Sequence, residues 1–493
     1  MSWGDQVKIR VSLLAAAYLL ASLSLLWPAF VLGHPIVSPD TPAYFKAGDL
    51  AVRLIWESLS GAIDWVIGGP GEHTEYIFGA GGTNVSEGTE ASLVPEDAVG
   101  VRSAYYGLIV RILGDASLWP IAAGQAAFAL YAIHRFISTF APFGSRSAIL
   151  IVFMLAVVSS LPWFVSYVMP DVLSGISILL ISTLLFQRNR LGPRVILIDC
   201  ALILFCLVSH FSNLLLAMAL SIVAFGAAAV FRNASWARLL PIRTVFLAVI
   251  LGVAVVANAA VNYVAFGTVA LTARNPPFLL ARSIVDGPGR PYLEEICHKP
   301  HITYFICRHL GELPRDVNVF LWDPHSVYMA ARPDQRARLR AEEREIVLNA
   351  AIAYPWLQLR SSLGNAWHNL ATFHVRDTRA DLVWHNDEQG YRVFEGDAPT
   401  TISVALAISS NVIYSSTLIS LVLIAVLAFR FGSCAVPPVA LFVLLALLGN
   451  AAVTGVFSSD APRYQARVIW LVPLIAIACM AAAFRTHARR SEV

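Results

Sequence analysis

The sequence predicts an all-α protein that crosses a membrane about ten times. Its 493 residues are 57% hydrophobic and only 14% charged, and the mean hydropathy is +0.66. A soluble domain needs roughly a quarter of charged residues to cover its surface, so this chain must use lipid as part of its solvent. Apolar runs of about 20 residues recur along it, which is the length that a helix needs to cross a bilayer.

Ten apolar runs separated by polar breaks are the candidate spans. They cover residues 9–32, 116–138, 147–168, 170–187, 195–209, 211–231, 244–266, 402–429, 436–457 and 466–484. The first run is too long for the core of a signal peptide and is flanked by Lys8 and Arg10. We therefore expect it to be retained as the first helix.

The distribution of charge orients these spans. Basic residues in short loops mark the cytoplasmic side, and the short connections and the tail carry eleven arginines: Arg146, Arg188, Arg190, Arg194, Arg232, Arg238, Arg243, Arg430, Arg485, Arg489 and Arg490. With a cytoplasmic N-terminus, ten spans place all of these arginines and both termini in the cytoplasm. Of the 32 Asp and Glu residues, only Asp5, Asp199 and Glu492 then lie off the opposite face. We expect a multi-pass protein of a bacterial plasma membrane, with its active face periplasmic or extracellular.

The predicted organisation has three parts. A membrane module over 1–266 contains the first outer loop, 33–115. A mixed outer-face segment follows over 267–401, between the seventh and eighth spans, and C-terminal membrane helices cover 402–493. The outer-face segment should contain a surface helix over 336–354, which reaches the membrane before Pro355, and a second helix to about residue 373.

The first outer loop should contain helices that lie in the membrane interface. Residues 44–59 and 103–113 have apolar positions at helical spacing, and the second of these is too short to span. Residues 68–88 are rich in Gly, Thr, Asn and Glu and should form a mobile loop.

This loop opens on a rigidly held carboxylate, Asp40. Three prolines within residues 34–44 fix an extended backbone just past the first span, because proline restricts both itself and the residue before it. The carboxylate is thus positioned for chemistry at the boundary of water and lipid. It can also cap the helix that begins near Pro42, and the two interpretations are compatible.

Three other outer positions carry candidate functional side chains. Asp171 stands in a very short turn before the fourth span, either as a helix cap or as a buried acid that needs a partner. His210, before the sixth span, is either a satisfied polar residue or a phosphate contact. Arg463 and Arg467 open the last span on the outer face, where they either snorkel or grip a lipid-linked phosphate.

Cys297 and Cys307 lie in a polar part of the outer-face segment. On the oxidising side of a bacterial membrane we expect them to form a disulfide. Three histidines lie close by, but the spacing fits no standard zinc motif, so we expect no metal and no cofactor. A divalent metal is not supported by any pattern in the chain.

Asp199 and Asn258 are polar residues inside predicted spans. Asp199 lies about one turn from Arg194 at the cytoplasmic end, so a local ion pair is expected. A proton-coupled transporter would carry more acids deep in its bundle, and their scarcity counts against transport.

Together these features resemble the GT-C superfamily of polytopic glycosyltransferases, which includes protein O-mannosyltransferases and lipid A aminoarabinose transferases. The likeness rests on Asp40 with Tyr44, the interfacial helices, the turn of Met169, Pro170 and Asp171, and Arg463 with Tyr464 and Pro473 in the last span. The resemblance extends over the layout of most of the chain, and each motif that supports it is short. The chain departs from better-known members in that Asp40 has no adjacent acid, the first loop has a Gly-rich insertion, and the outer segment is not C-terminal.

The resemblance implies inverting transfer of a sugar from a polyprenyl-phosphate donor to an envelope glycan, lipid or protein. It implies Asp40 and Asp171 as catalytic residues, since the acceptor hydroxyl must lose a proton as it attacks. Cations must balance the leaving phosphate. The expected substrate-binding residues are Tyr44, Arg102, His210, Arg463, Tyr464 and Arg467. The expected partners are donor, acceptor and membrane lipid, and the net charge of +3 indicates no nucleic acid.

Two alternatives stay open at this stage. A polysaccharide polymerase of the O-antigen type would use outer-loop arginines to handle two lipid-linked chains. A lipid-linked oligosaccharide flippase or transporter would place charges deep within its spans, whereas this chain places them at one rim.

Overall fold

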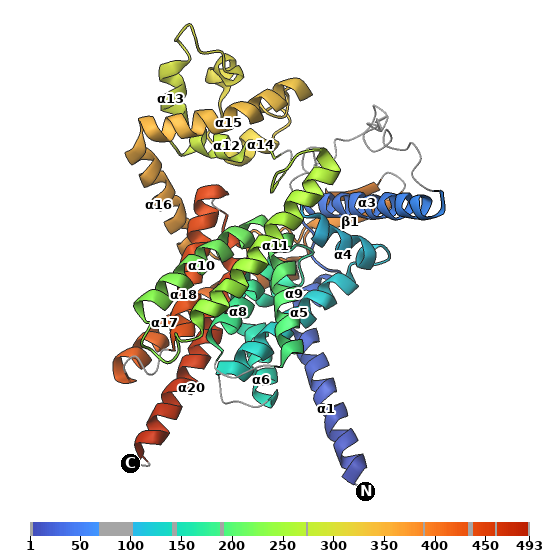
Figure 1. Cartoon of the computed structure of the whole chain (residues 1–493), viewed down its shortest axis with the longest axis vertical. Helices are drawn as coiled ribbons and strands as arrows, with labels where there is room; N and C mark the ends of the chain where they lie inside the picture. Colours follow the sequence, from blue (N-terminus) through green and yellow to red (C-terminus); the bar gives the residue numbers. More distant parts are fainter. Residues whose placement is uncertain are drawn as a thin grey trace.

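The structure is a computed structural model that describes residues 3–68, 102–140, 145–187, 192–272, 275–387, 390–431, 437–458 and 461–491. Within these ranges the chain is built from helices, with one two-stranded sheet (Figure 1). The predicted mobile loop 68–88 lies outside the described residues from position 69 onward, and so do Arg188 and Arg190.

The predicted spans all fall on helices of one bundle. These helices are α1 (Trp3–Ser24), α2 (Trp27–Leu32), α5 (Trp119–Phe140), α6 (Ser145–Val158), α7 (Leu161–Val165), α8 (Val172–Phe186), α9 (Pro193–Ser209), α10 (Phe211–Val230), α11 (Leu240–Phe266), α17 (Thr400–Phe431), α18 (Pro438–Phe457), α19 (Arg463–Ile469) and α20 (Leu471–Ser491). Five described helical stretches are long and apolar enough to cross a membrane: Phe211–Val230, Leu240–Phe266, Thr400–Phe431, Pro438–Phe457 and Arg463–Phe484. The total of about ten spans stays a prediction.

Breaks inside the apolar runs explain part of this difference. The run predicted over 147–168 divides into α6 and α7 near Pro162, which opens the next helix and has no N–H to continue the previous one. α8 has only 15 residues, and every one of them is buried. An apolar helix that is buried all round occupies the centre of a bundle, so the turn before α8 lies at the end of the central helix.

A second unit lies at the end of the molecule opposite both termini (Figure 1). This outer unit, residues 278–353, contains α12 (Phe278–Val285), α13 (Gly289–Ile296), η2 (Phe305–Glu312), α14 (Val317–Trp322) and α15 (Pro333–Ala353). It has its own buried core, which includes Leu280, Phe320 and Leu339. α16 (Pro355–Ala371) then returns the chain to the bundle. β1 (Leu382–Asp387) and β2 (Gly390–Glu395) form an antiparallel hairpin that pairs Leu382 with Glu395.

α3 (Thr41–Gly68) lies crosswise to the bundle helices and packs on α4 (Ala104–Gly114) (Figure 1). Helices were predicted at both places, and this is confirmed; their position in a membrane interface stays a prediction. The two helices meet backbone to backbone, since a Cβ added at Gly48 would lie 2.3 Å from the Gly107 carbonyl oxygen. Asp40 directly precedes α3 and Arg102 comes just before α4, so this crossing brings the two side chains together.

Candidate active site

A cavity of about 580 Å³ lies where α3, α4, the bundle and the outer unit meet. Seven of the eight predicted catalytic and substrate-binding residues line it: Asp40, Tyr44, Arg102, His210, Arg463, Tyr464 and Arg467. The eighth, Asp171, is hydrogen-bonded to Arg467 and lies directly behind it. The residues that the sequence singled out from distant segments therefore converge on one cavity.

Backbone contacts position the two short segments that carry the carboxylates. Ile36 and Tyr167 form an isolated parallel bridge, in which the Ile36 N–H donates to the Ser166 carbonyl at 2.8 Å and the Val168 N–H donates to the Ile36 carbonyl at 2.8 Å. This bridge fixes the proline-rich segment before Asp40 against the turn before Asp171.

Asp40 forms the first of two ion pairs at the site. Arg102 donates from Nη2 to Asp40 Oδ1, and Arg463 Nη2 lies 3.8 Å from Oδ2. Burial acts to raise the pKa of Asp40, but the Arg102 and Arg463 guanidinium groups outweigh it and hold the pKa below its usual value. The carboxylate is thus ionised at neutral pH and remains a quarter exposed, at 25%.

The helix start at α3 uses the backbone of Asp40. The N–H groups of Ala43 and Tyr44 donate to the Asp40 carbonyl oxygen, and Thr41 Oγ1 accepts from the Ser38 N–H. The carboxylate itself is directed to the two arginines. A role of this carboxylate in chemistry stays a prediction.

Arg102 is held in place through its neighbour Ser103. The Ser103 hydroxyl caps α4 by accepting from Tyr105 and Tyr106 N–H and donates to the Val208 carbonyl at 2.7 Å. The Arg102 guanidinium also lies over the ring of Tyr44, 5.8 Å from its centroid, a distance typical of a cation–π contact. α4 therefore presents Arg102 to the cavity from a start that is tied to α9.

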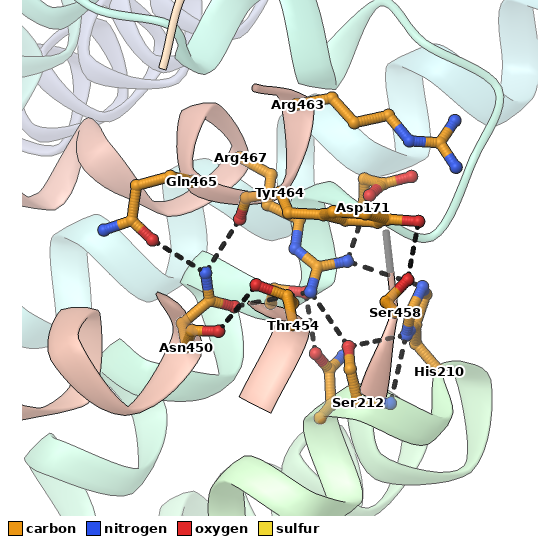
Figure 2. Close-up of polar contacts among 12 residues, drawn as sticks. Asp171, His210, Ser212, Asn450, Thr454, Ser458, Arg463, Tyr464, Gln465 and Arg467 are labelled. Carbon is orange, nitrogen blue, oxygen red and sulfur yellow. Dashed lines mark hydrogen bonds and ion pairs between the residues drawn. The ribbon is translucent and has the colours of Figure 1, made fainter. Parts of the chain in front are cut away.

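Arg467 and Asp171 form a deeper, fully buried ion pair (Figure 2). Arg467 Nη1 donates to Asp171 Oδ1 at 3.1 Å, and Nη2 donates to Ser212 Oγ at 2.9 Å and to Asn450 Oδ1 at 3.3 Å. Their side chains are 0% and 1% exposed. The snorkelling interpretation is thus wrong for Arg467, and Asp171 makes no side-chain cap bond although it stands at the N-cap of α8.

The Tyr464 ring lies between Arg467 of this buried pair and the more exposed Arg463. Figure 2 shows its ring between Arg463 and Arg467, whose guanidinium carbons lie 5.2 Å and 5.3 Å from the ring centroid. The Ser458 hydroxyl donates to the Tyr464 hydroxyl at 2.9 Å. Arg463 remains 35% exposed, so it can meet a ligand while Arg467 is held by protein contacts.

His210 is a neutral member of the site. Burial and the charge of Arg467 lower the pKa of His210 to about 3. Its Nδ1 accepts from the Ser212 N–H at 3.3 Å, and Arg467 Nη1 approaches its Nε2 at 3.4 Å. The positive charge of Arg467 disfavours a second proton on the ring. His210 would therefore meet a phosphate as a neutral ring, and its substrate-binding role stays a prediction.

Uncharged residues that hold Arg467 were missed by the sequence reasoning. Asn450 donates to the Gln465 side chain at 3.0 Å and to the Tyr464 carbonyl at 2.8 Å, while its oxygen accepts from Arg467. Asn450 could have been identified from the sequence, because it lies inside an apolar run and a buried amide needs hydrogen-bond partners.

The predicted pair of Asp199 with Arg194 is also corrected. Arg135 on α5 donates from Nη2 to Asp199 Oδ2 at 2.7 Å, and the Tyr131 hydroxyl donates to Oδ1 at 2.6 Å. Asp199 is 1% exposed, so it is satisfied across the α5–α9 contact instead of along its own helix.

The remaining wall of the cavity is mostly apolar, with a short row of amides. Leu279 and Leu321 belong to the apolar part, and Asn258, Asn262 and Asn275 form the row. Each amide nitrogen already donates to a protein oxygen: Asn258 to the Ala254 carbonyl at 2.9 Å, Asn262 to the Ala270 carbonyl at 3.0 Å and Asn275 to Thr272 Oγ1 at 2.7 Å. The buried Asn275 Oδ1 has no hydrogen-bond partner among the described residues. The row therefore offers acceptors, which suit a ligand with hydroxyl groups.

Cys297 and Cys307 are joined by a disulfide in the outer unit. Their sulfurs are thus not thiolate ligands. Across the described residues, no three His, Cys, Asp or Glu side chains lie close enough together to hold a metal ion.

No family model, curated protein or solved structure matches this chain. The inference of function therefore rests on the fold and the cavity. These define a helical protein with membrane-length apolar helices, in which a paired carboxylate and guanidinium groups face an otherwise mostly apolar cavity.

Proposed function

We propose that this protein is a glycosyltransferase of the plasma membrane, which moves a sugar from a polyprenyl-phosphate donor to a hydroxyl of an envelope glycan, lipid or protein on the outer face. One observation carries the proposal: Asp40, Arg102 and Arg463 share one wall of a cavity whose other walls are mostly apolar. A carboxylate, guanidinium groups and apolar surface suit the three parts of such substrates, namely hydroxyl, phosphate and lipid.

The proposed reaction is a single displacement with inversion. The acceptor oxygen attacks the anomeric carbon as the bond between that carbon and the phosphate oxygen breaks, and the electron pair of that bond stays on the phosphate. The hydroxyl proton passes to the Asp40 carboxylate. This proton becomes acidic only as the new bond forms, so a carboxylate with a low pKa is a sufficient acceptor late in the step.

The charge of the site supports a donor with one phosphate. Arg467 is neutralised by Asp171, and His210 is neutral. On the wall that carries Asp40, Arg102 and Arg463 together exceed the charge of Asp40 by one positive charge, while the carboxyl group of Glu343 lies on the outer-unit wall and accepts from the Leu279 and Leu280 N–H groups. A sugar linked through one phosphate is a phosphodiester with a single negative charge, which this excess balances. A diphosphate would leave negative charge without a partner in a poorly hydrated cavity.

The amide row gives the sugar or acceptor hydroxyls a place to bind. Backbone carbonyls fix the orientation of Asn258 and Asn262, because a carbonyl can only accept from the amide nitrogen. Their amide oxygens are then the atoms offered to a ligand, and hydroxyl groups can donate to them.

Asp40→Asn is the direct test. The amide keeps the shape of the side chain but cannot take the proton, so we expect the transfer rate to fall by about a hundredfold or more. Purified protein in liposomes would be given labelled polyprenyl-phosphate sugars and candidate acceptors, and release of polyprenyl phosphate would be measured.

Asp49→Asn is the matched control. Asp49 lies on the same helix and pairs with Arg111 at 2.6 Å, but it does not line the cavity. Its replacement should leave the rate unchanged. Full activity of Asp40→Asn would refute the role of Asp40. Translocation of the intact donor in acceptor-free liposomes would favour the flippase alternative.

A further inference from the structure

α16 is an amphipathic helix whose polar face contacts protein and whose apolar face is exposed. This is the reverse of the arrangement expected for a protein in water. Its 17 residues contain one Asp, Glu, Lys or Arg, which is Arg360. The helix lies between the outer unit and the upper end of α18 (Figure 1). A helix of this kind in a soluble protein turns its apolar stripe inward and its polar face to solvent.

The polar face of α16 packs against protein. Asn369 is fully buried and donates to Thr454 Oγ1 on α18 at 3.1 Å, and Asn365 donates to Asp286 at 3.0 Å. The contact is close enough that a Cβ added at Gly455 would lie 2.7 Å from the Ala366 backbone nitrogen. This face is therefore fixed to α18 and to the outer unit.

The opposite face of α16 is large, apolar and exposed. Trp356, Leu359, Leu363 and Trp367 follow one another at helical spacing and are 47 to 80% exposed. Ile352, at the end of α15, extends this face and is 76% exposed. A continuous apolar surface of this kind marks contact with another molecule or with a membrane.

The neighbouring surface indicates lipid as the occupant. Exposed apolar side chains also occur on the packed neighbour α18, where Leu441 and Leu448 are 56% and 48% exposed. α18 is one of the helices long and apolar enough to cross a membrane. Tryptophan is enriched at the membrane–water interface, and a long arginine side chain such as Arg360 can reach the head groups from an apolar face.

We propose that α16 lies in the outer leaflet of the bilayer, with the face of Trp356, Leu359, Leu363 and Trp367 against acyl chains. The sequence had placed all of 267–401 outside the membrane, so this assigns a membrane-embedded helix to that segment. At about 25 Å, α16 is shorter than the roughly 30 Å hydrocarbon core. It would thus anchor the outer unit at the depth of Thr454, which lines the cavity. The inference does not depend on the proposed reaction.

Site-specific fluorescence tests this placement. In full-length protein with Cys200, Cys206, Cys434 and Cys479 replaced and the disulfide kept, Leu363→Cys would carry an environment-sensitive nitrobenzoxadiazole label in liposomes. Spin-labelled lipids should quench the label at 363 several times more strongly than aqueous iodide does. Arg315→Cys, on the exposed surface of the outer unit, is the matched control and should show the reverse order.

Quenching at 363 by iodide to the extent seen at 315 would overturn the proposal, since it would place α16 in water. Protection of the label from both quenchers would also overturn it, because protein would then cover the face. Modification by a membrane-impermeant maleimide in native membranes, strong at 315 and weak at 363, gives a second measurement that needs no purification.

Discussion

At the scale of single residues, three arginines at the candidate site have different roles. Arg467 is buried and bound to Asp171, Ser212 and Asn450, so it braces the last span against the central helix. Arg463 is partly exposed beside the cavity. Arg102 donates directly to Asp40 and helps to keep that carboxylate ionised.

Replacement of Arg102 by Met should shift the acid limb of the pH–rate profile to higher pH. Without this guanidinium, burial raises the pKa of Asp40, so the carboxylate takes up a proton at a higher pH and the base is lost sooner as pH falls. Initial transfer rates between about pH 4 and pH 8 would locate the limb.

Arg111→Met provides the comparison for this variant. It breaks the pair with Asp49, which lies outside the cavity, so the acid limb should stay in its wild-type position. An unshifted limb in Arg102→Met would show that Arg102 does not control the protonation of Asp40.

The sequence singled out residues that converge on one cavity, but several of their partners were not predicted. Asp40, Asp171 and Arg463 stand at helix starts on the acid-rich face, which is a property of the chain itself. Asp199 was assigned to Arg194 by spacing, whereas its partner Arg135 lies on α5. Spacing describes neighbours along one helix and does not reveal which faces of two helices meet.

At the scale of elements, the crossing of α3 and α4 fixes the distance between Asp40 and Arg102. A Cβ at Gly107 would lie 2.6 Å from the Tyr44 carbonyl oxygen, just as one at Gly48 would meet Gly107. These neighbours are backbone atoms, which cannot turn aside as a flexible side chain could. The ion pair of Asp40 with Arg102 therefore depends on glycine at positions 48 and 107.

Gly48→Val should separate the two helices and weaken the site. We expect the free energy of unfolding to fall by about 1 to 3 kcal/mol from overpacking and the transfer rate to fall with it. Gly124→Ala is the control, because a Cβ there meets nothing within 4 Å. Thermal unfolding and initial rates report both effects, and wild-type values for Gly48→Val would contradict the assigned role of the crossing.

The existence of the helices was predictable from apolar runs, but their interruptions and faces were not. α6 ends shortly before Pro162, which opens α7, and the composition of the apolar run does not reveal this break. The helix after Pro355 was expected, yet its polar face turned out to contact α18. Periodicity alone cannot tell whether protein or lipid meets the apolar stripe.

At the scale of the whole molecule, the cavity needs both the bundle and the outer unit. Leu279, Leu321 and Glu343 of the outer unit line the same space as Asp40 and Arg463. Glu343 also accepts from the N–H groups of Leu279 and Leu280 at the start of α12. The order of the outer unit therefore bears on substrate binding, although that unit has a separate core.

Replacement of Cys297 and Cys307 by Ser should loosen the outer unit and spare the bundle. The two cysteines are 10 positions apart in the chain, and loss of such a cross-link costs about 3 kcal/mol in the chain-entropy description. Limited proteolysis should then cut the outer unit faster, and reductant should reproduce this in the wild type. Equal cleavage rates with and without the disulfide would show that it does not hold the unit together.

The contact of Gly48 with Gly107 also bears on how this chain can evolve. Asp40 and Arg102 are separated by 62 positions, yet the backbones that carry them are joined at the crossing. A substitution at Gly48 or Gly107 therefore acts on the positions of Asp40 and Arg102 together, so we expect the two glycines and the ion pair to be kept or lost as a set when the sequence diverges.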